Sequence, residues 1–239
     1  LRGSTDPASN TGNDNTALGY QTLRSNTTGE GNTASGSGAL FYNTTGFANT
    51  ATGTYSLNNN SIGNNNTAIG YRALESSTTG NFNTASGSNA LSYNTTGLWN
   101  TGIGSNALYF NIEGNANVAV GNAALLSNAT GSSNTANGTD ALYWNISGSS
   151  NTAIGHRTLF TNTTGVNNTA VGKEALLTIL TGSNNTAIGY KADVAEDAIV
   201  NATAIGSNAY AGASNSVVIG SVNGVNGATA SANVGIGTS

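Results

Sequence analysis

Apolar residues recur along this chain with a 17-residue period. Each unit follows the pattern N-T-A-(I/V/S)-G-x-x-A-L-x-x-N-T-T-G-x-x, which returns without insertion from Asn15 to Asn185 and again, in register, from Ala202. The ninth position is leucine in ten successive units: Leu23, Leu40, Leu57, Leu74, Leu91, Leu108, Leu125, Leu142, Leu159 and Leu176. Self-similarity of this kind predicts a repeat architecture of about thirteen to fourteen stacked units with a continuous apolar column in its core.

The length of the unit predicts a β-solenoid. Two helices need about 33 residues per repeat, and two glycines per unit disfavour helices in any case. In the unit beginning at Asn66 we expect a first strand over Thr67–Ile69 and a second through Ala73–Leu74, with Gly80 supplying a positive φ in the second turn. Equivalent strands then stack in parallel about 4.8 Å apart. The fold class is therefore all-β, a parallel β-solenoid (β-roll) of 17-residue coils, roughly 60 Å long.

Each column of the repeat predicts a place in the coil. The Thr at position 2 and the mostly aliphatic residue at position 4 share one side of the strand, and we expect both to point inward. The Ala at position 3 then faces outward as a possible contact between chains. The Asn at position 1 is expected to form a hydrogen-bonded ladder along the axis.

A single coil buries little apolar surface. Burying one Leu is worth roughly 1.5–3 kcal/mol, whereas ordering each residue costs roughly 1.5 kcal/mol. The side chains of one coil do not offset the ordering of a whole 17-residue unit. This shortfall favours association of several chains, through the Ala column.

The repeat also predicts the domain boundaries. Residues 1–14 precede the first unit and are expected to form an N-terminal arm or linker, and residues 15–201 carry the 17-residue coils. The spacing changes in residues 202–239, where a 14-residue step separates Ile205 from Ile219 and a 17-residue step again separates Ile219 from Ile236.

Residues 202–220 resemble a known family. The phrase Ala204-Ile205-Gly206, followed after a small-residue turn by Ser216-Val217-Val218-Ile219-Gly220, is similar to the 14-residue head repeat of YadA-like trimeric autotransporter adhesins. The resemblance implies a left-handed β-roll, a homotrimer and a head that binds host or matrix surfaces. The ending ANVGIGTS at residues 232–239 resembles phrases in phage tail fibre-type proteins. Both point to a trimeric extracellular fibre, on a bacterial cell surface or a virion tail.

Composition and charge exclude several classes of protein. Charged residues are 7% of the chain, where about 25% is typical, and the net charge is −4. Six Lys and Arg neutralise too few phosphates for nucleic acid to be expected as a partner. No apolar run reaches the roughly 18 residues that a membrane-spanning helix needs, so no membrane span is expected. The absence of Cys excludes disulfides.

Candidate catalytic chemistry is sparse. His156 is the single His and stands at the variable position 6, which indicates a surface residue. The acidic residues, among them Glu75, Glu113, Asp140 and Glu174, share no fixed position. We therefore expect no enzyme activity, no metal site and no cofactor.

Aromatic residues gather at positions 10 and 11 and form the candidate binding ridge. Its members are Phe41, Tyr42, Tyr93, Tyr109, Phe110, Tyr143, Trp144 and Phe160. A second group, Phe47, Phe82 and Trp99, lies late in the unit. Exposed apolar surface often marks an interaction site, so the ridge is interpreted either as a site for glycans or surface proteins, or as a packing contact between protomers.

One column of Asn residues at position 12 carries N-x-S/T sequons. These possible glycosylation sites, expected on a turn edge, are Asn26, Asn43, Asn94, Asn128, Asn145 and Asn162.

The pattern as a whole predicts a structural and adhesive module of an extracellular fibre, a rigid repetitive solenoid that displays a binding surface for host, matrix or neighbouring cells. The alternative is a self-assembling filament subunit whose open ends stack end to end, because exposed strand edges template such pairing. Lesser alternatives are a phage tail fibre shaft and an ice-binding solenoid. The last is disfavoured if the Thr column points inward.

Overall fold

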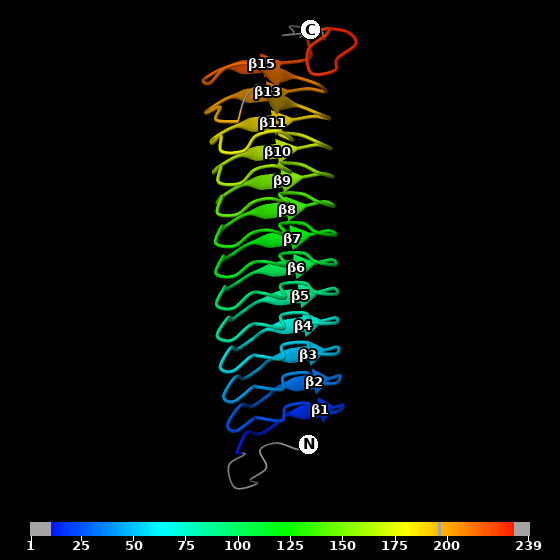
Figure 1. The fold of residues 1–239 in the computed structure, drawn as a ribbon, viewed down its shortest axis with the longest axis vertical. Coiled ribbons are helices and arrows are strands. Elements are labelled where there is room, and N and C mark those ends of the chain that lie inside the picture. The colour runs from blue at the N-terminus through cyan, green and yellow to red at the C-terminus, as the bar shows by residue number, and fades with distance from the viewer. Residues whose placement is uncertain (1–10, 196, 232–239) are drawn as a thin grey trace, which may run out of the picture.

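The computed structural model describes residues 11–195 and 197–231, and these residues form one long stack of coils (Figure 1). Thirteen strands form one parallel sheet, in the order β1 to β11, then β13 and β15. Their bounds are β1 Thr16–Leu18, β2 Thr33–Ser35, β3 Thr50–Thr52, β4 Thr67–Ile69, β5 Thr84–Ser86, β6 Thr101–Ile103, β7 Val118–Val120, β8 Thr135–Asn137, β9 Thr152–Ile154, β10 Thr169–Val171, β11 Thr186–Ile188, β13 Thr203–Ile205 and β15 Val217–Ile219. The predicted all-β parallel solenoid is confirmed.

The register of the sheet follows the sequence repeat. Thr67 pairs with Thr84, one 17-residue unit later, and equivalent positions pair in every neighbouring strand up to β13. Between β13 and β15 a 14-residue unit intervenes, and Thr203 pairs with Val217. The shorter unit therefore removes three residues from the turns and leaves the strand register intact.

The predicted second strand is wrong for the first ten coils. Their residues at positions 8 and 9 lie in turns, and the ten leucines of the core column have φ between 47° and 54°. This left-handed conformation costs roughly 1–2 kcal/mol for a residue with a Cβ. Each of these leucines is fully buried, which offsets that cost. A second strand forms only near the C-terminal end, where β12 Asp193–Val194 pairs with β14 Tyr210–Ala211.

The prediction of which strand side faces inward is also wrong. Ala68 in β4 is fully buried, whereas Ile69 is 47% exposed and Thr67 is partly exposed, and the same pattern repeats along the sheet. The reason is lack of space between the sheet and the leucine column. At Gly102, which stands in the Ala column, even an added Cβ would lie 3.3 Å from Cγ of Leu91. Only Ala or Gly fits there, so the larger side chains face outward.

The predicted Asn ladder at position 1 is confirmed. Asn32 donates from Nδ2 to Oδ1 of Asn15 at 3.1 Å and to the Gly46 carbonyl at 2.8 Å, and its backbone N–H also donates to Asn15 Oδ1. A second buried ladder runs through position 12, where Asn43 donates to Asn26 Oδ1 at 2.8 Å and to the same Gly46 carbonyl at 2.9 Å. The two ladders satisfy polar groups that the thin interior would otherwise leave unpaired.

The glycine columns have two different causes. At position 5 the glycines from Gly19 to Gly206 have φ between 119° and 143°, which L side chains rarely adopt. At position 15 the predicted positive φ is wrong: Gly80 does not have one. An added Cβ at Gly80 would instead lie 2.7 Å from the carbonyl oxygen of Gly97 in the next coil. Close approach of the backbones, not turn conformation, requires that glycine.

The solenoid begins before residue 15. The Thr11 N–H donates to the Thr27 carbonyl at 2.7 Å, and the Asn13 carbonyl accepts from the Gly31 N–H at 3.0 Å. Residues 11–14 therefore belong to the stack rather than to the predicted arm. The other arm residues, 1–10, and the tail-fibre-like phrase at 232–239 lie outside the described residues. Within the described part of the chain, no helix is long and apolar enough to cross a membrane.

Candidate functional site

The outward side of the sheet presents two continuous columns of side chains. We call it the strand face: the side chains at positions 2 and 4 of the 13 strands of the large sheet. Because the strands are parallel and in register, position 2 forms a column of Thr, and position 4 forms a column of mostly aliphatic residues. Ile103, Ile154 and Ile188 are each more than 40% exposed. Neither column contains a charged residue, so the strand face has the composition of an interaction surface.

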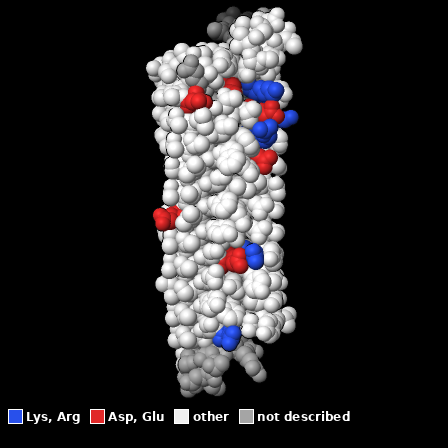
Figure 2. Space-filling model, in the orientation of Figure 1, with Lys and Arg blue, Asp and Glu red and all other residues white. Residues whose placement is uncertain are grey.

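Charged and aromatic side chains border this face. Turns that follow the strands carry Arg72, Arg157, Lys173 and Lys191 at positions 6 and 7. The Arg72 guanidinium lies 5.2 Å from the ring centroid of Tyr71, and Lys191 lies 5.6 Å from that of Tyr190. Most of the few charged side chains visible in Figure 2 follow one side of the stack. Protein–protein interfaces likewise have a core depleted of charged residues and a polar, solvent-accessible rim.

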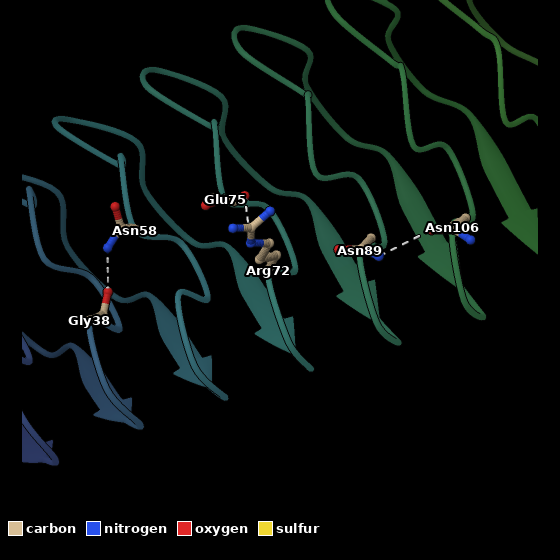
Figure 3. A network of polar contacts seen from close by, with 6 residues as sticks. All are labelled: Gly38, Asn58, Arg72, Glu75, Asn89 and Asn106. Carbon is tan, nitrogen blue, oxygen red and sulfur yellow. Dashed lines mark hydrogen bonds and ion pairs between the residues drawn. The ribbon is translucent and has the colours of Figure 1, made fainter.

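Short polar contacts lie within and between the coils along this border (Figure 3). Arg72 pairs with Glu75 at 3.6 Å, and Asn89 donates to Asn106 Oδ1 in the next coil at 3.3 Å. These contacts hold the rim side chains in position without placing charge on the strand face.

The structure brings the predicted ridge residues together in three clusters. Tyr93, Tyr109 and Phe110 lie with ring centroids 4.6–5.4 Å apart. Burial raises the pKa of the Tyr109 hydroxyl, and its contact with Tyr93 adds to the rise. Phe41 and Tyr42 form a second, smaller cluster with centroids 4.4 Å apart.

The third cluster contains the largest exposed ring of the ridge. Tyr143 lies 4.8 Å from Trp144 and stacks on Phe160 at 5.2 Å between ring centroids. The Arg157 guanidinium lies 4.5 Å from the Phe160 centroid. In the separate late group, Phe82 and Trp99 stack at 6.1 Å, and both rings are more than half exposed.

The six sequon asparagines lie in the second buried ladder, which corrects the interpretation of a turn edge. Each donates from Nδ2 to the carbonyl of the glycine three residues later; in Asn145 that bond is 2.9 Å, and a second bond to Asn128 Oδ1 is 2.7 Å. A sugar on Nδ2 would break these bonds and has no space in the folded coil. Sequence reasoning missed this ladder because Asn before Thr-Thr-Gly is also typical of exposed turns.

The ladder is interrupted at two places. Ser77 replaces Asn at position 12 and is too short to continue it, which leaves Asn60 Oδ1 and Ser77 Oγ buried without a partner. Ile179 replaces Asn one coil after Asn162, and Asn162 Oδ1 is likewise unpartnered.

The titratable residues are dispersed. His156 is exposed, as predicted. Among the described residues, no group of three His, Cys, Asp or Glu could hold a metal ion. A buried carboxyl with a strongly shifted pKa is that of Asp193, which takes the place of leucine at position 9. Desolvation raises its pKa to about 6, against hydrogen bonds from the Val194 N–H and the Thr178 hydroxyl.

A scan against protein-family models finds no match to this chain, and a search of curated proteins also finds none.

Proposed function

We propose that this chain is a rigid structural module of an extracellular fibre, which associates side by side with copies of itself and displays aromatic side chains to its surroundings. One observation carries the proposal: an uncharged column of exposed aliphatic side chains runs in register along the 13-stranded sheet. Water-exposed apolar surface of this extent favours a covering partner. Since the interior of each coil is thin, that partner also supplies stability that a single chain lacks.

The covering partner is a second copy of the chain. The resemblance of residues 202–220 to trimeric adhesin repeats supports a homotrimer on a bacterial cell surface or in a virion tail fibre, and the low charge suits a long, close contact between chains. We assign no catalysis to the module. Its work follows from length, rigidity and repetition.

Sedimentation equilibrium and native mass spectrometry test the association. We expect a discrete oligomer for the natural sequence and dissociation of the double variant Ile103→Lys and Ile154→Lys, because it places charges in the covered column. Ile62→Lys, at an equally exposed position off the strand face, serves as the control and should remain associated. A natural chain that stays monomeric at high concentration would overturn the proposal.

The displayed contact surface is the late aromatic group, Phe47, Phe82 and Trp99: all three rings are exposed, and Phe82 stacks on Trp99. Large exposed rings are suited to stack on sugars or on surface proteins. We expect Trp99→Ala to weaken binding to immobilised glycans or matrix proteins and to leave the oligomer intact. If Trp144→Ala abolishes that binding and leaves association unchanged, the ridge is the displayed surface instead.

Two other functions each have one observation in their favour. The sheet ends at β1 and β15, each with a single neighbouring strand within the described residues, which suits an end-to-end filament. The Thr column faces outward with one hydroxyl in each coil except those of Val118 and Val217, and neighbouring coils are about 4.8 Å apart, which suits an ice-binding face. Concentration-dependent fibres in electron micrographs would favour the first, and thermal hysteresis of the purified chain the second.

A further inference from the structure

From the second to the eighth coil, a longer period of three coils is superimposed on the exposed positions of the repeat, and the eleventh coil, with Ile188 and Ala195, does not continue it. At position 4 of the strand face, small or amide side chains replace the aliphatic ones at this spacing: Ser35, Ser86 and Asn137. At position 11 of the ridge, aromatic rings recur at the same spacing: Tyr42, Tyr93 and Trp144. Each ring stands in the same coil as one of these polar residues. We call the polar residues notches and the rings knobs.

The other coils invert this relation. Where position 4 is a large aliphatic residue, position 11 is small, as in the pairs Leu18 with Ser25, Ile69 with Ser76, Val120 with Ser127, Ile154 with Thr161, Val171 with Thr178 and Ile188 with Ala195. Two coils depart from the rule. One pairs Thr52 with Asn59, and the other pairs Ile103 with Phe110.

Packing inside one chain does not explain this compensation of size. Position 4 lies on the strand face and position 11 on the segment that follows the core leucine, and in most pairs the larger side chain is exposed. Ile69, for example, is 47% exposed and Trp144 is 48% exposed. The matching sizes therefore point to a contact between the two surfaces in different chains.

We infer that each knob enters the notch at the same level of a neighbouring copy, so that the ridge of one chain packs on the strand face of the next. The inference rests on the proposed side-by-side association and adds which surfaces meet and at what height. Successive knobs are three coils, about 14 Å, apart. A shift by one coil would press Tyr93 and Trp144 against an Ile or Val and leave their notches empty, and both errors destabilise a packed contact.

The polarity of each pair agrees with this arrangement. The knobs that share a coil with a Ser or Asn notch are Tyr or Trp, which carry an O–H or N–H donor, and the notch supplies an oxygen acceptor. Phe110 has no donor, and its coil carries Ile103 instead. A buried contact then leaves no donor of a ring unpaired.

The arrangement also limits the symmetry. Two different surfaces meet, so the interface is heterologous, and chains at the same level have no rise between them. A heterologous interface gives a closed ring when the rotation between neighbours closes, and an open assembly when it does not. Without rise a helical filament is excluded, and a rotation that closes gives a bundle of parallel chains.

Cysteine cross-linking tests the level directly, because the chain has no Cys of its own. Two variants, Ile69→Cys and Ser76→Cys, are mixed, refolded together and treated with a mild oxidant, which takes up the two hydrogens that the thiols lose. We expect a covalent dimer from this mixture and little from either variant alone. The matched control pairs Ile69→Cys with Ser127→Cys, which occupies the equivalent place three coils away and should not cross-link.

The outcomes separate this inference from the proposed function. The inference is overturned, and the association stands, if the chain associates but Ile69→Cys cross-links equally well with Ser76→Cys and with Ser127→Cys. The same holds if Ile69→Cys cross-links with copies of itself. A monomeric natural chain overturns both.

Size compensation gives a second test that does not depend on cysteine. Ser86→Ile fills a notch opposite an unchanged knob, and we expect the dissociation constant of the oligomer to rise at least about tenfold. Adding Tyr93→Ser converts the coil to the inverted type and should recover most of that loss. Losses that simply add in the double variant would contradict knob-and-notch contact, and circular dichroism of each variant checks that it folds.

Discussion

The coils from Asn15 to Leu176 and the coils after Leu176 follow different interior rules under one continuous sheet. In the first region every coil has a buried Leu at position 9, and nearly every coil has Asn at position 12. In the second region Asp193 takes the leucine position, Ile179 takes the Asn position, and a short second strand, β12, forms. Neither change disturbs the pairing of β10, β11 and β13. The sheet and its glycine column are therefore the constant part of the coil, and the opposite wall tolerates exchange.

The strictest test of that comparison is the glycine column, where we expect the largest effect. Gly104 has φ +128°, and an added Cβ would lie 2.5 Å from the Gly121 carbonyl oxygen. Gly104→Ala combines a strained backbone with a clash between coils and should lower the free energy of unfolding by about 4 kcal/mol. Thermal and urea unfolding measure it. Gly212→Ala, with nothing within 4 Å, is the control and should change little; equal losses would contradict the argument.

Asp193 gives a pH-dependent test of the difference between the two regions. Its pKa is raised from 3.8 to about 6, so between these values the folded chain binds more protons than the unfolded one. Stability is then highest at low pH and falls as the pH rises from about 4 to 6. Asp193→Asn should remove this fall and stabilise the chain at pH 7 by about 3 kcal/mol at most, since each pKa unit corresponds to about 1.4 kcal/mol.

The measurement is urea unfolding of both proteins between pH 4 and pH 7. Asp193→Leu restores the leucine column of the first region, and the stability of this variant should likewise lack the fall between pH 4 and pH 6. A natural chain that becomes more stable as the pH rises from 4 to 6 would show that Asp193 is not the buried, desolvated group described above.

The interruption at Ser77 offers a smaller effect inside the regular region. Ser77→Asn would give Asn60 Oδ1 the donor that it lacks and continue the second ladder, with Gly80 supplying the carbonyl acceptor. We expect a gain of about 1–2 kcal/mol in the free energy of unfolding. Thr79→Asn, two residues later and outside both the ladder and the proposed contact between chains, is the matched control. A loss of stability in Ser77→Asn would mean that the ladder does not tolerate an amide in this coil.

Much of this fold could be predicted from the sequence, because repeat spacing alone determines coil number and strand register. The 14-residue unit from Ile205 to Ile219, the leucine column and the first Asn ladder all followed from the spacing. The inward side of the strand did not, since alternation separates two sides without saying which is buried. Hydrophobicity favoured Ile69, but the space beside Leu91 admits only a methyl group or less.

The candidate surfaces were predicted less well for the same reason. Because Thr and Ile were predicted to point inward, the strand face was not recognised as a surface, and the Ala column was interpreted as the contact between chains. The aromatic ridge was found because its rings share two positions of the unit. The second Asn ladder was missed, because a buried ladder and a row of turns have the same composition.

Backbone conformation gives the last and smallest contrast between the two regions. In the first region the leucines at position 9 have left-handed φ, whereas Asp193 and Tyr210, at that position in the second region, lie in strands. Position 7 is left-handed in both regions, as at Ala123 and Lys191. Asn and Gly adopt this conformation at lower cost. Ala123→Gly should therefore stabilise the chain by up to about 1 kcal/mol. Ala124→Gly, at a buried neighbour without left-handed φ, should destabilise it. Thermal unfolding of both variants is the measurement. If backbone strain governs this turn, the two melting temperatures shift in opposite directions, and if packing governs it, both melting temperatures fall.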